Sequence, residues 1–168
     1  MRRNFKIIAF VFAIALSLAS CKPLHEQISI NDYSLDNLGS ISVGLTQLSV
    51  GADLNVDADN ASCYDIVLKK LYAQIYSKNG KLFATVTLDA KKDIGKPTLK
   101  RRSSQLVDIP LQIEFESPLS ALALADLDAF VKRGYTVNYD CTLKAGIFQK
   151  RFKEEDVPLE QLVKMLEK

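Results

Sequence analysis

The stretch LYAQIYSKNGKLFATVTL, residues 71–88, decides the fold class because it predicts a β-hairpin. Leu71, Ala73 and Ile75 share one face of the incoming strand. In the outgoing strand, one parity is expected to point inward (Leu82, Ala84, Val86, Leu88) and the other outward (Phe83, Thr85, Thr87). Asn79-Gly80 is the strongest short hairpin signal, since both central residues of a type I′ turn take positive φ. The stretch therefore predicts an antiparallel β protein.

The segments around this hairpin alternate in the same way and supply the other strands. Residues 41–58 carry the first strand, with a bulge or break expected near Thr46–Gln47 to reconcile two parities. Pro110 within the run 107–115 predicts an edge position or a bulge, and the charged run 147–157 predicts an edge strand. With the run 135–143 this gives six or seven strands. Burying their inner faces predicts a mainly β fold, a two-sheet antiparallel β-sandwich.

Two helices are expected beside the strands. Ser117-Pro118 combines a capping side chain with proline at the first helical position, and Gly134 is a C-terminal cap residue. These signals predict one inserted helix over residues 118–133, whose apolar stripe faces the core. Residues 158–167 predict a short amphipathic helix at the C-terminus.

The N-terminal 20 residues match a secretory signal, with Arg2, Arg3 and Lys6 before the apolar run 7–18. Leu18-Ala19-Ser20-Cys21 resembles a bacterial lipobox, which implies lipid attachment to Cys21 and cleavage before it. The alternative is a transmembrane anchor, but these 12 residues, apolar except for Ser17, span only about 18 Å as a helix. The expected organisation is a signal peptide (1–20), a tether (21–40) and one β-sandwich domain (41–168).

Removing the leader changes the charge balance of the chain. The whole sequence has 22 Lys and Arg against 20 Asp and Glu, and three of the cations lie in residues 1–20. The mature chain would carry 19 Lys and Arg against 20 Asp and Glu, a formal charge of −1. No nucleic-acid partner is therefore indicated. His25 is the only histidine and lies in the polar tether, which is expected to be extended. We therefore expect no metal site and no cofactor.

A polar loop over residues 91–104 concentrates positive charge. Its cations are Lys91, Lys92, Lys96, Lys100, Arg101 and Arg102. One interpretation is a patch for anionic lipid headgroups. The other is a solvated connection between strands, which the lack of interleaved aromatic residues and the Gly95–Pro97 segment favour.

Cys63 and Cys141 would be the two thiols left after lipid modification of Cys21. An exported protein meets an oxidising compartment, so a disulfide between them is one hypothesis. The alternative is two free thiols that pack as small apolar groups, because a bridge needs Cα atoms within about 7 Å of each other.

Four stretches together resemble the late embryogenesis abundant type 2 domain, also called the water-stress and hypersensitive-response domain. They are LSVGADLNVDA followed by Asp59-Asn60, LYAQIYSKNGKLFA, VDIPLQIEF and YTVNYDCTLKAG, within residues 40–157. The resemblance implies a sandwich of immunoglobulin or fibronectin type III shape with one inserted helix. It also implies a link with stress protection, and membrane-attached relatives are discussed as binders of lipid or protein.

We expect a lipid-anchored extracytoplasmic protein of the cell membrane or outer membrane that acts as a non-catalytic binding module. Its partners would be the membrane, through Cys21, and an envelope protein or lipid. The alternative is a lipid-handling protein with an apolar groove between helix 118–133 and the sheet. An enzyme is not expected, because the domain lacks histidine and its paired acids (Glu114 and Glu116, Asp126 and Asp128) are interpreted as surface charge.

Overall fold

The structure is a computed structural model that describes residues 27–36, 41–44, 47–89, 96–120, 129 and 132–161. The strands within these residues are β1 (Ile28–Asp36), β2 (Ile41–Val43), β3 (Leu48–Asn60), β4 (Ile66–Tyr76), β5 (Leu82–Leu88), β6 (Thr98–Leu99), β7 (Ser103–Phe115), β8 (Thr136–Ala145) and β9 (Phe148–Pro158). They pair antiparallel in the order β1-β3-β7-β5-β4-β8-β9, with β2 beside β3 and β6 beside β4.

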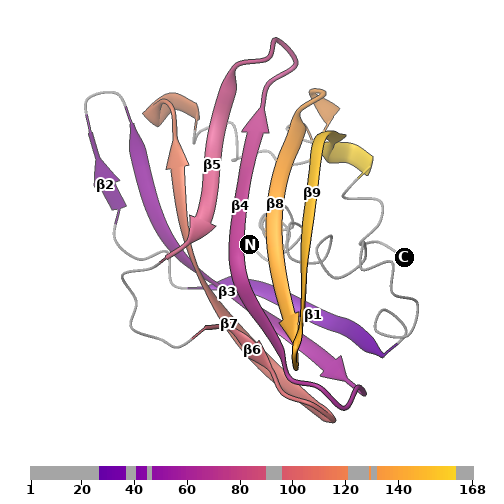
Figure 1. The fold of residues 1–168 in the computed structure, drawn as a ribbon. Helices are drawn as coiled ribbons and strands as arrows, with labels where there is room; N and C mark the ends of the chain where they lie inside the picture. The colour runs from indigo at the N-terminus through magenta and orange to yellow at the C-terminus, as the bar shows by residue number, and fades with distance from the viewer. Residues whose placement is uncertain are drawn as a thin grey trace.

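This single sheet curls into a half-barrel (Figure 1). The predicted mainly β, antiparallel architecture is confirmed, whereas the division into two facing sheets of immunoglobulin-like topology is not. β3 and β7 pair without interruption from Leu48 opposite Phe115 to Asn60 opposite Ser103. Because neighbouring strands are twisted against each other, such long unbroken pairing lets the twist accumulate along the sheet and curls it.

The core lies on one face of the sheet and follows the alternation of the strands. Leu54, Val56, Ile109 and Leu111 are almost fully buried at the centre of β3 and β7, and Tyr139 of β8 is 2% exposed. The outward residues between them, such as Asn55 and Gln112, are only half-buried. This is the period-two pattern expected of strands with one covered face.

The 71–88 hairpin forms between β4 and β5, but with a different turn from the predicted one. Gly80 has φ of 73°, whereas Lys78 and Asn79 do not have positive φ. The Gly80 N–H donates to the Ser77 carbonyl at 2.8 Å, and Ser77 N–H donates to the Lys81 carbonyl. This is a three-residue loop, a type I turn followed by a left-handed glycine, and not a type I′ turn.

The orientation predicted for Phe83 is wrong because of a bulge next to this loop. Ile75 lies opposite Ala84 and Tyr76 lies opposite Leu82, which leaves Phe83 as the extra residue. Phe83 therefore points inward and is 7% exposed, with edge-to-face contacts to the rings of Phe115 and Tyr135. The inward positions predicted for Ala84 and Val86 are confirmed.

One of the predictions about the N-terminal part is wrong. The segment assigned to a tether contains β1, which pairs with β3 and packs Ile28, Ile30 and Tyr33 against the core. A bulge between Ile30 and Asp32 broke the alternation that would have shown this strand in the sequence. Residues 41–58 form the two strands β2 and β3, so the predicted break, and not the bulge, reconciles the two parities: the chain reverses between the two strands and pairs Ile41 with Val50.

The predictions for the C-terminal half are mostly confirmed. β9 is an edge strand, and Gly134 has the positive φ of a cap residue. Pro110 is not on an edge strand, since β7 pairs on both sides. It lies where pairing with β5 stops after Leu111, so no ladder bond is lost.

The described residues include parts of both predicted helices. Pro118–Ser120 form a short turn of 3₁₀ helix, Ala129 and Lys132 are helical, and Leu159–Gln161 begin the C-terminal helix. The remainder of these helices lies outside the described residues, as do Cys21, His25, Lys91 and Lys92. No helix in the described part of the chain is both long enough and apolar enough to span a membrane.

Candidate functional site

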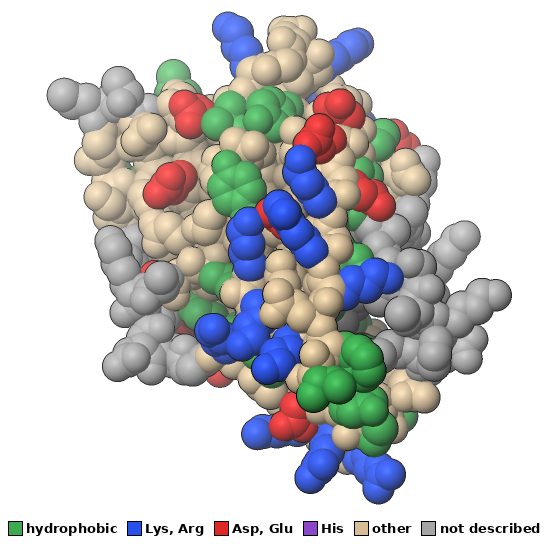
Figure 2. Space-filling view, in the orientation of Figure 1, with side chains coloured by type: hydrophobic (Ala, Val, Ile, Leu, Met, Phe, Trp, Pro, Cys, Tyr) green, Lys and Arg blue, Asp and Glu red, His purple; other side chains and the backbone are tan. Residues whose placement is uncertain are grey.

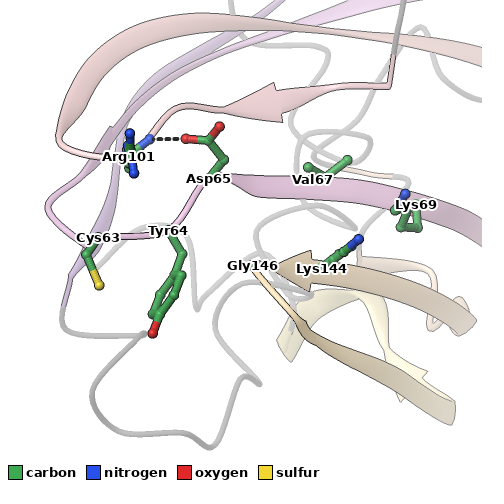
Figure 3. A pocket seen from close by; sticks show the side chains of 8 residues that line it. All are labelled: Cys63, Tyr64, Asp65, Val67, Lys69, Arg101, Lys144 and Gly146. Atoms are coloured by element: carbon green, nitrogen blue, oxygen red, sulfur yellow. Dashed lines mark hydrogen bonds between the residues drawn. The ribbon is translucent and has the colours of Figure 1, made fainter.

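A pocket of about 350 Å³ lies at one end of the half-barrel, where β4 begins and β8 ends (Figure 3). Three separate parts of the chain meet there: the loop 61–65 with the start of β4, the turn 100–102, and the end of β8. The lining residues are Cys63, Tyr64, Asp65, Val67, Lys69, Arg101, Lys144 and Gly146.

Asn60, the last residue of β3, holds the loop that forms one wall of the pocket. Its side chain is 1% exposed. The Asn60 amide donates to the backbone carbonyls of Tyr64 at 2.9 Å and Leu99 at 3.3 Å, and its carbonyl oxygen accepts from the Ser62 N–H at 3.0 Å. A buried amide with its bonds made in this way fixes a loop where no regular ladder can. This role of Asn60 was not predicted from the sequence.

The turn 100–102 is joined to the same loop by backbone bonds. The Arg101 N–H donates to Oδ1 of Asp65 at 2.8 Å, and the Arg102 N–H donates to the Ser62 carbonyl at 3.2 Å. Arg102 has a φ of 49°, an uncommon conformation for a residue other than glycine. These contacts bring Arg101 to the pocket, although 36 residues separate it from Asp65.

A β-bulge in β4 supplies another cation. The pairing with β8 runs from Leu68 opposite Leu143 to Lys70 opposite Thr142, which leaves Lys69 as the extra residue. A bulge of this kind keeps two consecutive side chains on the same face. Lys69 and Lys70 are therefore both outside the core, and Lys69 lies beside Lys144 of β8, which is opposite Val67.

The positive charges of this pocket have no carboxylate partners among the described residues. Lys69, Lys96, Lys144 and Arg101 make no ion pair there. The neighbouring Lys96 ammonium, with smaller contributions from partial burial and Lys144, lowers the pKa of Lys69. Asp65 is the one acid that lines the pocket, and Arg101 N–H already occupies one of its oxygens. Repelling cations held together in this way favour an anionic ligand.

An apolar tip adjoins the pocket at the β8–β9 turn. Gly146 has φ of 60° and Ile147 does not have positive φ, so Gly146-Ile147 forms a type II′ turn between paired Ala145 and Phe148. Ile147 is 89% exposed and Phe148 is 63% exposed. The rings of Phe148 and Tyr64 pack edge to face, with 6.4 Å between their centroids. We call Tyr64, Ile147 and Phe148 the apolar tip.

Tyr64 belongs to both the pocket and the tip, and Gly146, which lines the pocket, directly precedes Ile147 of the tip. A Cβ atom placed on Gly146 would lie 2.7 Å from Cδ1 of Tyr64, so only glycine lets the ring approach this closely. Figure 2 shows exposed hydrophobic side chains clustered near the lower end of the molecule, with Lys and Arg side chains on both sides of them. Cationic and apolar groups thus share one continuous surface.

The structure brings together only some of the cations that the sequence grouped. Arg101 lines the pocket and Lys96 lies beside Lys69, while Lys100 and Arg102 are exposed near the turn 100–102. Lys69, Lys144 and the apolar tip were not predicted. The Lys69-Lys70 doublet, together with the change of apolar parity from Ile66 and Leu68 to Leu71 and Ala73, was a detectable bulge signal.

Cys63 and Cys141 are free thiols, which rules out the hypothesis of a disulfide in this structure. Cys63 is exposed at the pocket, whereas Cys141 is buried in the middle of β8, opposite Leu71 and Phe152. Cys63 lies before the start of β4, whereas Cys141 lies opposite Leu71, which is several residues along β4. The spacing along the strand keeps the two sulfurs apart.

A second cluster of charged residues lies on the outer face of β4, β8 and β9. Asp140 accepts hydrogen bonds from Lys70 at 2.5 Å and from Arg151 through Nε and Nη2, both at 2.7 Å. Those hydrogen bonds hold the pKa of the Asp140 carboxyl well below its usual range. Because Lys70 and Arg151 both bind this one carboxylate, the cluster ties the edge strand β9 to β8 and β4.

The described residues contain no group of three or more His, Cys, Asp and Glu side chains that could hold a metal ion. The groove between helix 118–133 and the sheet, which the lipid-handling hypothesis requires, falls on residues outside the described ones. In the pocket, Cys63 is the one thiol, and Asp65 is the one carboxylate. The arrangement is suited to holding an anion by charge and hydrogen bonding.

No family model matches the chain, and no curated protein is detectably similar to it. Two solved structures have weak likeness to it. The first is titled "Crystal structure of protein from Archaeoglobus fulgidus", with 14% identity over 76% of this chain and 97% of that chain and a TM-score of 0.37. The second is titled "X-ray structure of Northeast Structural Genomics Consortium target SoR45". It has 10% identity over 79% of this chain and 84% of that chain, and a TM-score of 0.38.

Proposed function

We propose that this protein is a lipid-anchored, extracytoplasmic binding module without catalytic activity, which holds an anionic group of its partner in the pocket between Lys69, Lys144 and Arg101. The observation that carries the proposal is the set of cations around this pocket that have no carboxylate partner within the described part of the chain. A binding site needs only complementary charge and shape, whereas catalysis also needs positioned nucleophiles or acid–base groups.

The anchoring part of the proposal rests on the lipobox-like sequence that ends at Cys21. Thioether-linked diacylglycerol with a further acyl chain would hold the protein stably on a membrane, at about 0.8 kcal/mol for each buried methylene. The resemblance to late embryogenesis abundant type 2 domains fits a role in binding rather than in catalysis, and a link with stress protection belongs to the same proposal.

Two measurements test the proposal. Growth with labelled palmitate should label the wild-type protein, and Cys21→Ser should abolish both labelling and membrane retention. Crosslinking in intact cells, followed by mass spectrometry of proteins and lipids, should recover a partner that Lys69→Ala/Lys144→Ala loses. The matched control is Lys78→Ala/Lys81→Ala, since both lysines are exposed at the β4–β5 turn. Absent labelling would refute the anchor, and equal capture by both double variants would refute the pocket.

A further inference from the structure

We infer that the apolar tip and the cations beside it dock on an anionic phospholipid bilayer, with Ile147 and Phe148 entering the headgroup region. The inference deepens the proposed function, and rests on it, because it names the ligand of the pocket as a lipid phosphate. The occupant is the membrane surface itself and not a soluble anion.

The tip is shaped to enter a membrane interface. The two-residue type II′ turn carries Ile147 beyond the paired ends of β8 and β9, and Phe148 is the first paired residue of β9; the two residues are 89% and 63% exposed. Tyr64, 40% exposed, supports Phe148 through its ring edge and has a polar hydroxyl at its end. Aromatic side chains with one apolar and one polar end are typical of the membrane–water interface.

The cations lie where lipid phosphates would be if the tip were inserted. Tyr64 of the tip also lines the pocket, and Gly146 of the pocket directly precedes Ile147, so the pocket that Lys69, Lys144 and Arg101 line adjoins the apolar side chains. Each Lys or Arg near an anionic membrane surface strengthens binding by about fivefold. Apolar insertion and charge attraction therefore act on the same end of the molecule.

The position at which β1 starts favours a bilayer over an acidic protein as the partner. The Gln27 carbonyl accepts a hydrogen bond from the Ala61 N–H at 2.7 Å, so β1 starts beside the loop that carries Tyr64. Cys21 is six residues before Gln27, and six residues span at most about 22 Å. A lipid on Cys21 would keep this end of the half-barrel within that distance of the bilayer.

The size of the patch also favours a bilayer. A stable protein interface buries about 800 Å² on each partner. Three exposed apolar side chains at a narrow turn make a small convex surface, which suits insertion between headgroups better than such an interface.

The chain has no tryptophan, so one introduced tryptophan reports on a single site. The test compares Ile147→Trp with Leu119→Trp, each in the full chain reconstituted into vesicles. Leu119 is 74% exposed and follows the end of β7 opposite the pocket, so it is a matched control. The vesicles contain acyl-brominated phosphatidylcholine, with or without phosphatidylglycerol.

The expected result is a blue shift and bromine quenching of the tryptophan at position 147 in phosphatidylglycerol vesicles, with little of either at position 119. Adding Lys69→Gln/Lys144→Gln should lower the docked-to-undocked ratio by about 25-fold, at about fivefold for each cation. A thermal unfolding curve that matches the wild-type curve shows that each variant is folded.

Three results would overturn the inference: no quenching at position 147, equal quenching at the two positions, or quenching that does not depend on lipid charge. A response of position 147 to poly-glutamate but not to vesicles would assign the surface to an acidic protein and also overturn it. The palmitate experiment reports on the anchor alone, so a failure of docking and a failure of anchoring are distinguishable.

Discussion

The Arg151 guanidinium binds the Asp140 carboxylate through two parallel hydrogen bonds of 2.7 Å, across the pair formed by β8 and the edge strand β9. The Asp140 side chain is 10% exposed, while those of Arg151 and Lys70 are 61% and 54% exposed. The carboxylate is thus covered by the cations themselves and not by the interior. Charge pairing holds in place a strand whose other edge is free of sheet partners among the described residues.

Asp140→Asn should destabilise the protein by about 1 kcal/mol at pH 7, after allowance for solvent screening of the two cations. The pKa of folded Asp140 lies below its unfolded value of 3.8, so its contribution is present above about pH 4 and is lost as the pH falls further. Urea unfolding of both proteins at several pH values checks this. A difference between them that stays constant from pH 7 to pH 2 would contradict it.

Gly80→Val should lower the unfolding free energy by about 1 kcal/mol or more, because a β-branched residue tolerates a φ of 73° poorly. No atom lies within 4 Å of a Cβ built at Gly80, so the cost comes from the backbone and not from a clash. Chemical denaturation measures the change, and Gly80→Asn should cost less. Lys81→Val is the control, and an equal loss in both valine variants would refute this explanation.

Asn60→Ala should cost about 2 kcal/mol, because it leaves the Leu99 carbonyl and the Ser62 N–H without their side-chain partner and leaves the Tyr64 carbonyl with the Ser62 hydroxyl alone. The loop that carries Tyr64 should also loosen, which faster amide exchange over residues 61–65 would show. Asn79→Ala, at an exposed turn position, should change stability by less than about 0.5 kcal/mol. Unchanged exchange in Asn60→Ala would mean that another contact fixes the loop.

Tyr139→Phe should leave stability unchanged or raise it slightly. The Tyr139 hydroxyl is buried without a hydrogen bond of standard geometry, although the Glu154 carboxylate lies near it. Burial, with a smaller effect of Glu154, raises the pKa of Tyr139 well above its usual value. Removing an unsatisfied buried group need cost nothing. A loss of more than about 1 kcal/mol in thermal unfolding would show that the hydroxyl has a partner.

Of the two thiols of the domain, only Cys63 should react with iodoacetamide in the folded protein. Cys63 is exposed, whereas burial raises the pKa of Cys141 to about 12 and also blocks access to it. In denaturant without reductant, mass spectrometry should find both residues alkylated. A species with neither residue alkylated under those conditions would restore the disulfide hypothesis.

The sequence by itself determined the features that depend on neighbouring residues. Period-two alternation identified β3, β5, β7 and β8, the Asn79-Gly80 pair located the β4–β5 turn, and Gly134 marked a helix end. The charged residues of β9 indicated its place at the edge. These signals are local because backbone conformation and the side-chain period are set within a few residues.

The tertiary structure alone decided which strands are neighbours, and with them the site. The extra residue Lys69 is defined only against β8, and the bulge in β1 only against β3. The pocket needs Lys69, Arg101 and Lys144, and the tip needs Tyr64 against Gly146, all brought together by pairing between distant segments. Such pairings are selected by burial and hydrogen bonding summed over the whole sheet, and that sum has no signature within any one stretch of sequence.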